Sequence, residues 1–202
     1  MIAVDNAADA ADATITTNNV QAGEIACQHI VDRLNGRGNV IIQNGPQNSA
    51  VIDRVNGCRD VLNAAPAIAI LSEDLDGRGS QAGGEEMARR HFSEFSNVDA
   101  LFAINDPQAI GINNIARQLG RSGMVITAVD GAPAIEEALV DPNSSMIEAS
   151  ASQNPFAMAK VAVQTGYGIL NGDQPDQKVV LLNSELVTRD NVADYAGWET
   201  ER

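Results

Sequence analysis

Residues 98–107 read VDALFAINDP and place a short apolar strand directly before the start of a helix. The run Val98–Ile104 has the length and composition of a buried strand. Asp106-Pro107 is typical of a helix start, because proline is favoured in the first turn, and the helix is expected to continue to Leu119. A strand that passes into a helix through so short a connection is the unit of a parallel sheet.

The same succession of strand and helix extends outward in both directions. Residues 124–133, MVITAVDGAP, place a second strand before a helix that spans 133–140. Further strands are expected at 40–42, 68–71, 145–149 and 178–182, further helices at 20–34, 50–64, 80–95 and 155–170, and the end of a strand at 1–5. Apolar strands that alternate with amphipathic helices predict an α/β fold, a parallel sheet flanked by helices.

Charge and composition exclude several classes of partner. The 202 residues carry 13 Lys and Arg against 27 Asp and Glu, a formal net charge of −14. Nucleic acids and anionic membrane surfaces both require a basic surface, so neither is an expected partner. No apolar run reaches the roughly 20 residues of a membrane span. Aromatic residues make up only 3% of the chain, with a single Trp.

The cysteines and histidines are too few for a zinc site. Cys27 and Cys58 are the two cysteines, His29 and His91 the two histidines, and no CxxC motif occurs. The cysteine pair allows one disulfide or two buried free thiols, and the spacing leaves both open. Both histidines are expected on the surface or satisfied within helices, and no metal or cofactor is expected.

Short polar side chains follow the predicted strands at the points where the strands end. In an open α/β sheet a ligand binds beyond the carboxyl ends of the strands, so these side chains are candidates for a binding site. The candidates are Asp5, Asn6, Asn105, Asp130 and Gln153, joined by Arg54 one turn into a helix. Carboxylates, amides and a guanidinium together can bind the hydroxyl groups of a neutral polyhydroxylated molecule.

Other polar residues near the strand ends are expected to have local structural roles. Aspartate at a strand end often caps the following helix or forms a turn. We expect Asp106 and Asp74 to do so, and with Asp106 as the cap the side chain of Asn105 is left for a ligand.

The motifs of common α/β enzymes are missing. Residues 119–123, LGRSG, do not form the G-x-S-x-G of a nucleophile elbow. Residues 77–83, GRGSQAG, miss the G-x-G-x-x-G spacing of a dinucleotide site by one residue. The only lysines are Lys160 and Lys178, so no P-loop lysine exists. We therefore expect a binding protein and not an enzyme.

Three strings occur in order along the chain: AINDP at 103–107, AVDGAP at 128–133 and ASASQNP at 149–155. Together with residues 44–57 and 186–192, they resemble the periplasmic sugar-binding proteins of ABC importers, in particular the ribose-binding-like branch. The resemblance covers essentially the whole chain.

The resemblance implies a type I periplasmic binding protein fold, in which two Rossmann-like lobes joined by three crossing strands close over a sugar. It implies that Asp5 binds sugar hydroxyls from the first lobe, and Arg54, Asn105 and Asp130 from the second. Gln153 would touch the ligand at a hinge. The hinges would lie near Thr17-Asn18, Gln153-Asn154 and Ser184-Glu185.

Two departures from the family pattern concern the ligand. Asn6 stands where ribose-binding relatives often carry arginine, and the loss of that cation changes which hydroxyl groups are recognised, so another pentose, a hexose or a sugar alcohol is an alternative to ribose. Leu75 stands where an aromatic residue of the second lobe is expected, so stacking from that lobe would be absent.

A third departure is length, because the opening strand–helix units of the family are missing. The resemblance then implies a partial N-terminal lobe from residues 1–17 and 154–183 and a complete C-terminal lobe from residues 18–153 and 184–202. The open edges and exposed apolar faces of a partial lobe are expected to lower stability or to drive homo-oligomer formation.

The function implied by the resemblance is that of a solute-binding component of an ABC sugar importer. Its partners would be a sugar or sugar alcohol and a membrane permease. The alternative is the effector-binding core of a sugar-responsive transcription repressor, which shares the fold. The opening residues MIAVDNAA do not show the pattern expected of a signal peptide, and the resemblance implies a periplasmic or other extracytoplasmic location. An oxidising compartment would favour a Cys27–Cys58 disulfide.

Overall fold

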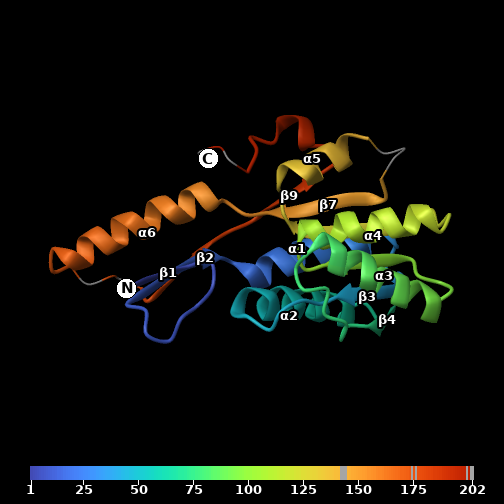
Figure 1. Ribbon diagram of the computed structural model, residues 1–202, viewed down its shortest axis with the longest axis horizontal. Helices are drawn as coiled ribbons and strands as arrows, with labels where there is room; N and C mark the ends of the chain where they lie inside the picture. The colour runs from blue at the N-terminus through green and yellow to red at the C-terminus, as the bar shows by residue number, and fades with distance from the viewer. Residues whose placement is uncertain (142–144, 174, 176, 199, 201–202) are drawn as a thin grey trace.

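A computed structural model describes residues 1–141, 145–173, 175, 177–198 and 200 and contains two sheets (Figure 1). One sheet has the strand order β1-β2-β8 and the other the order β4-β3-β5-β6-β7-β9. The strands are β1 Ile2–Val4, β2 Ala13–Thr17, β3 Arg37–Gln43, β4 Ala67–Ser72, β5 Ala100–Ala103, β6 Val125–Asp130, β7 Ile147–Ser152, β8 Val179–Leu182 and β9 Glu185–Thr188. The helices are α1 Asn19–Arg33, α2 Ser49–Asn63, α3 Gln81–Glu94, α4 Asp106–Gln118, α5 Pro133–Val140, α6 Pro155–Leu170 and the 3-10 helix η1 Val192–Asp194.

The six-stranded sheet carries helices on both faces, which confirms the predicted α/β fold. Neighbouring positions along the strands point to opposite faces, so Ile41 packs into one core and Val40 and Ile42 into the other. Helices α3, α4 and α5 cover the face that carries Ile41, and α1 and α2 cover the face that carries Val40 and Ile42. The strands are parallel except β9, which pairs antiparallel with β7.

Helices α1 and α2 lie unusually close together. A Cβ atom on Gly23 would stand 2.0 Å from the Arg54 carbonyl oxygen, and one on Gly57 would stand 2.1 Å from that of Val20. Only glycine permits this approach. A disulfide between Cys27 and Cys58 joins the same two helices, with 5.1 Å between the Cα atoms. The helix pair is therefore fixed by backbone contact and by a covalent link.

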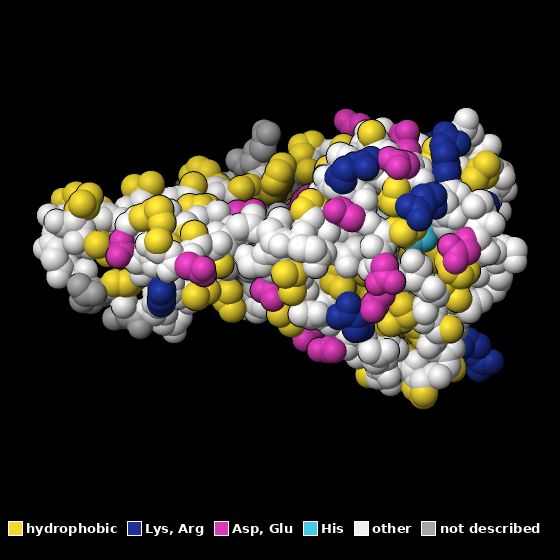
Figure 2. All heavy atoms as spheres, turned by 60° about the horizontal axis from the view of Figure 1, so that its bottom comes forward, with side chains coloured by type: hydrophobic (Ala, Val, Ile, Leu, Met, Phe, Trp, Pro, Cys, Tyr) yellow, Lys and Arg dark blue, Asp and Glu magenta, His cyan; other side chains and the backbone are white. Residues whose placement is uncertain are grey.

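The three-stranded sheet is small and poorly covered. Helix α6 packs on it around Ile15, Met158 and Ala162, and this part extends away from the rest of the molecule (Figure 1). Figure 2 shows hydrophobic side chains spread over this narrow part. Most of the exposed large hydrophobic side chains of the described residues belong to it: Met1, Val4, Phe156, Val163, Tyr167, Leu170, Val179 and Leu181.

Two strands of the structure differ from the elements expected from the sequence. Strand β2 is absent from the elements expected from the sequence, because ATITT follows a run of Ala and Asp and has only one large apolar residue, Ile15. Strand β9 is also absent from the expected elements, and its antiparallel direction departs from an all-parallel sheet.

Among the described residues, no helix is long and apolar enough to cross a membrane.

His91 is neither on the surface nor satisfied. It lies fully buried on the face of α3 that carries Met87 and Phe92, where helical spacing aims it at the core. Neither ring nitrogen has a hydrogen-bond partner among the described residues. Burial, with a smaller contribution from the nearby charge of Arg90, lowers the pKa of His91 to about 4.

Candidate functional site

A cavity of about 440 Å³ opens where the two sheets meet. Its lining includes all six polar residues that the sequence singles out: Asp5, Asn6, Arg54, Asn105, Asp130 and Gln153. They come from loops after β1, β5 and β7, from the last residue of β6 and from the first turns of α2. Residues far apart in the sequence are thus brought to one place by the parallel order of the strands.

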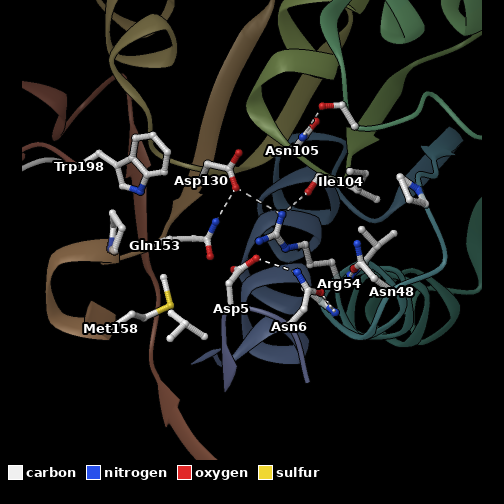
Figure 3. A pocket seen from close by; sticks show the side chains of 16 residues that line it. Asp5, Asn6, Asn48, Arg54, Ile104, Asn105, Asp130, Gln153, Met158 and Trp198 are labelled. Atoms are coloured by element: carbon white, nitrogen blue, oxygen red, sulfur yellow. Dashed lines mark hydrogen bonds and ion pairs between the residues drawn. The ribbon is translucent and has the colours of Figure 1, made fainter. Parts of the chain in front are cut away.

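Arg54 is the central donor of the site. It is 5% exposed, and its Nε donates to Asn19 Oδ1 at 2.8 Å. Its Nη1 donates to the Ile104 carbonyl oxygen at 2.8 Å and to Asp130 Oδ1 at 3.3 Å (Figure 3). Its Nη2 donates to no residue that the structure describes. The guanidinium is therefore held on one edge and keeps a donor for another molecule.

Asp130 ends β6 in an uncommon backbone conformation, with φ of +138°. Its Oδ1 accepts from Gln153 Nε2 at 2.7 Å and from Arg54. Burial raises the pKa of Asp130 above its usual range, although the charge of Arg54 and the Gln153 hydrogen bond act in the opposite direction. A buried carboxylate that is paired and strained in this way is typical of a functional position.

Gln153 connects the two sheets. Its Oε1 accepts from the Thr17 hydroxyl at 2.8 Å, and Thr17 ends β2. Its Nε2 donates to Asp130 in the other sheet, and its backbone N–H donates to the Asp130 carbonyl oxygen at 2.7 Å. One side chain therefore links the small sheet to the floor of the cavity.

Asp5 and Asn6 line the cavity from the side of the three-stranded sheet, directly after β1. Asp5 has φ of +70°, and its backbone is held by hydrogen bonds to Ile15 and from Thr16. Asn6 Nδ2 donates to Asp5 Oδ2 at 2.9 Å, and Asn6 Oδ1 accepts from the Ala50 backbone N–H at 3.4 Å. This pair brings the small sheet against the start of α2.

Asn105 takes the capping role expected of Asp106, so that expectation is wrong, and Asp106 neither caps α4 nor lines the cavity. Asn105 is the N-cap of α4, because its Oδ1 accepts from the Gln108 N–H at 3.2 Å, and its Nδ2 donates to the Gly79 carbonyl oxygen at 2.9 Å. Asn105 still lines the cavity. Asp106 is buried behind it, where Oδ1 accepts from the Ser150 hydroxyl at 2.6 Å and Oδ2 from the Ala132 N–H at 2.7 Å.

Asp106 carries the strongest electrostatic perturbation near the site. Burial raises its pKa well above the usual range, and the neighbouring charge of Asp130 adds to the rise. Its two hydrogen bonds hold the turn that follows Asp130, since Ser150 Oγ also accepts from the Gly131 N–H. Asp106 is therefore a structural support of the cavity floor.

The other side of the cavity is apolar, and sequence reasoning missed it. Trp198, Pro155 and Met158 line it, and Figure 3 shows Trp198 and Met158 across the cavity from Arg54 and Asn48. Pro155 and Met158 begin a helix that could be anticipated, but no periodic pattern places Trp198. Leu75, which stands where the family resemblance predicts an aromatic residue, does not line this cavity.

The site combines neutral and charged hydrogen-bonding groups with an apolar wall. Among the described residues there is no cluster of His, Cys, Asp and Glu that could hold a metal ion. Two carboxylates face one guanidinium, so an anion would meet repulsion from Asp5 and Asp130. The arrangement is suited to a small ligand rich in hydroxyl groups.

Comparison with known proteins adds a family and several relatives. Residues 1–174 match the family described as periplasmic binding protein domain. The xylitol-binding protein of Mycolicibacterium smegmatis is 27% identical over 95% of this chain and 55% of its own length. The ribose import binding protein of Escherichia coli is 26% identical over 81% of this chain and 54% of its own length. The chain thus spans about half the length of these relatives.

A solved structure supports the fold. The solute-binding protein of an ABC transporter from Bacillus halodurans C-125, with bound myo-inositol, superposes with a TM-score of 0.85. The superposition covers 96% of this chain and 67% of that protein, at 20% sequence identity. At that identity the similarity establishes the fold but not the ligand, which is inferred from the residues of the site.

Proposed function

The chain belongs to the periplasmic binding protein domain family, and from this premise we propose that it binds a neutral sugar or sugar alcohol as the solute-binding part of an ABC importer. The observation that carries the proposal is the convergence of Asp5, Arg54, Asp130 and Gln153 on one cavity between the two sheets. The relatives named above bind xylitol or ribose according to their names.

The hydrogen-bonding inventory of the cavity supports a neutral, hydroxylated ligand. Each hydroxyl group donates one hydrogen bond and accepts others. Asp5 and Asp130 accept, Arg54 donates, and the amides of Asn6 and Asn105 do both. Enclosing such groups in a dehydrated site strengthens each interaction, provided that every one is satisfied.

We propose that binding closes the two parts of the molecule on each other. The chain crosses between the sheets at three places: after Thr17, around Gln153 and between Leu182 and Glu185. Gln153 touches both sides through Thr17 and Asp130. Short crossings that flank a polar cavity suit a hinge, in which a few terminal residues absorb the movement. Residues 1–17 and 154–183 would move as one lobe and the rest as the other.

The cellular role follows from the same premise. The relatives are binding proteins and not enzymes, so we propose that the chain works without catalysis or a cofactor. We further propose a periplasmic location and recognition of the closed form by a membrane permease.

A ligand screen tests the proposal. The thermal midpoint of unfolding is measured with xylitol, ribose, allose and myo-inositol, and with glucose 6-phosphate and spermidine as charged controls. A ligand that binds only the folded state raises the midpoint in proportion to its occupancy. We expect a rise with at least one neutral compound and none with the charged controls. A rise with the phosphorylated sugar alone would contradict the proposal.

A further inference from the structure

We propose that Trp198 forms the apolar wall of the binding site and packs against the C–H face of a bound sugar or polyol, which makes residues 192–198 part of that site. This inference rests on the function proposed above and adds a residue that specifies the ligand. The family match ends at residue 174, so the segment lies outside the matched range.

The segment is anchored beside the floor of the cavity. After β9, Asn191 closes a turn by accepting from the Thr188 N–H at 2.7 Å and donating to the Leu186 carbonyl oxygen at 2.9 Å. The Tyr195 hydroxyl then donates to the Gly131 carbonyl oxygen at 3.0 Å. Gly131 directly follows Asp130, so the anchor ties the segment to the backbone that presents the central carboxylate.

The backbone between anchor and indole turns toward the cavity. Gly197 has φ of +89°, a conformation that glycine adopts without strain. A Cβ atom on Gly131 would stand 2.8 Å from the Tyr195 hydroxyl, so the close contact at the anchor also requires glycine. Both glycines therefore support the position of Trp198.

The indole faces the cavity with a vacant donor. Trp198 lines the cavity together with Pro155 and Met158, opposite Arg54 (Figure 3). Its Nε1 is buried and donates to no residue that the structure describes. Buried indole N–H groups usually have a partner, so a ligand oxygen is a suitable acceptor. A sugar carries hydroxyls at its rim and C–H bonds on its faces, which matches polar groups on one side and an indole on the other.

The test uses the fluorescence of the single Trp and the calorimetric affinity of the same samples. Wild type, Trp198→Phe and Trp198→Ala are titrated with whichever neutral compound the ligand screen identifies. Tyr167→Ala is the matched control, because Tyr167 is a 71% exposed aromatic residue on α6 that does not line the cavity. Circular dichroism checks that each variant is folded.

We expect the Trp emission of the wild type to change on titration and to saturate at the calorimetric dissociation constant. Trp198→Ala should weaken binding about tenfold, Trp198→Phe much less, and Tyr167→Ala not at all. If Trp198→Ala fails to fold, the wild-type emission and the affinity of Trp198→Phe test whether Trp198 contacts the ligand.

Two results would overturn the inference. Calorimetric binding with unchanged Trp emission and unaltered affinity in the Trp198 variants would refute the role of Trp198 and leave the proposed function standing. Absence of heat from every neutral compound with the wild type would refute the proposed function and the inference together.

Discussion

Arg54 Nη1 lies 3.3 Å from Asp130 Oδ1, and both residues are buried in the floor of the cavity. The pair joins the start of α2 to the end of β6. A buried ion pair contributes little net stability, since desolvation opposes the attraction, but the loss of one partner is costly. The pair therefore fixes the geometry of the site more than it stabilises the fold.

Replacement of Arg54 by methionine should be strongly destabilising. Arg54→Met leaves Asp130 buried without its cation and also removes the hydrogen bonds to Asn19 and Ile104. We expect a loss of about 3 kcal/mol in the free energy of unfolding, measured by urea titration. Arg37→Met, at an exposed position of β3, is the control and should change stability by less than about 0.5 kcal/mol. Equal effects of both variants would argue against the structural importance of the pair.

His91 should make stability sensitive to mild acid. Its pKa of about 4 in the folded protein lies below the ordinary value of 6.5, so the unfolded chain takes up a proton first. The contribution of His91 to stability is therefore complete above pH 6.5 and is lost as the pH falls toward 4. The difference in stability between wild type and His91→Leu should change by about 3 kcal/mol across this window.

The control for this prediction is Met87→Leu, a change of similar volume on the same buried face of α3 that removes no titratable group. Its pH profile of stability should run parallel to that of the wild type. Parallel pH profiles for wild type and His91→Leu would show that His91 does not titrate differently on folding.

Reduction of the Cys27–Cys58 disulfide should lower stability. The bond closes a loop with a sequence separation of 31 residues, for which the chain-entropy relation gives about 3–4 kcal/mol. Urea unfolding with and without reductant measures the loss. Alkylation followed by mass measurement establishes the state of the thiols. Two alkylated cysteines in the untreated protein, or identical unfolding curves, would contradict this prediction.

The exposed apolar surface of α6 should promote self-association. Val163, Tyr167 and Leu170 are 72%, 71% and 87% exposed, and contiguous apolar surface of this kind is unusual on a monomer. Light scattering during gel filtration should show an average mass that rises with concentration. Val163→Lys with Leu170→Lys should suppress the rise. A wild type that remains monomeric at high concentration would contradict the prediction.

Much of the six-stranded part could be predicted from the sequence because its signals are local. The strand at 100–103 and the helix from Asp106 are separated only by Ile104 and Asn105, and Asn105 caps the helix. Parallel strands align their carboxyl ends, so strand-end residues such as Asp130 and Gln153 could be assigned to one cavity before their contacts were known.

The features that could not be predicted depend on tertiary contacts, which leave no local pattern in the sequence. The position of Asp106 is decided by hydrogen bonds from Ser150 and Ala132, which are distant in sequence, and the capping role then belongs to Asn105. Strand β2 is short and rich in threonine, and it is a strand because β1 and β8 pair with it. Trp198 reaches the cavity through the Tyr195 anchor to Gly131, which no periodicity reveals.

The central claim, that this cavity binds a neutral sugar or sugar alcohol through its polar floor, is tested most directly by calorimetric titration of wild type and Asp130→Asn. Asp130→Asn keeps the shape of the side chain but removes the charge opposite Arg54. Asp9→Asn, at an exposed position in the β1–β2 loop, is the control. We predict saturable binding of one neutral compound by the wild type and by Asp9→Asn, weakened at least about tenfold in Asp130→Asn. Equal affinity in all three proteins, or no binding by the wild type, would contradict the account.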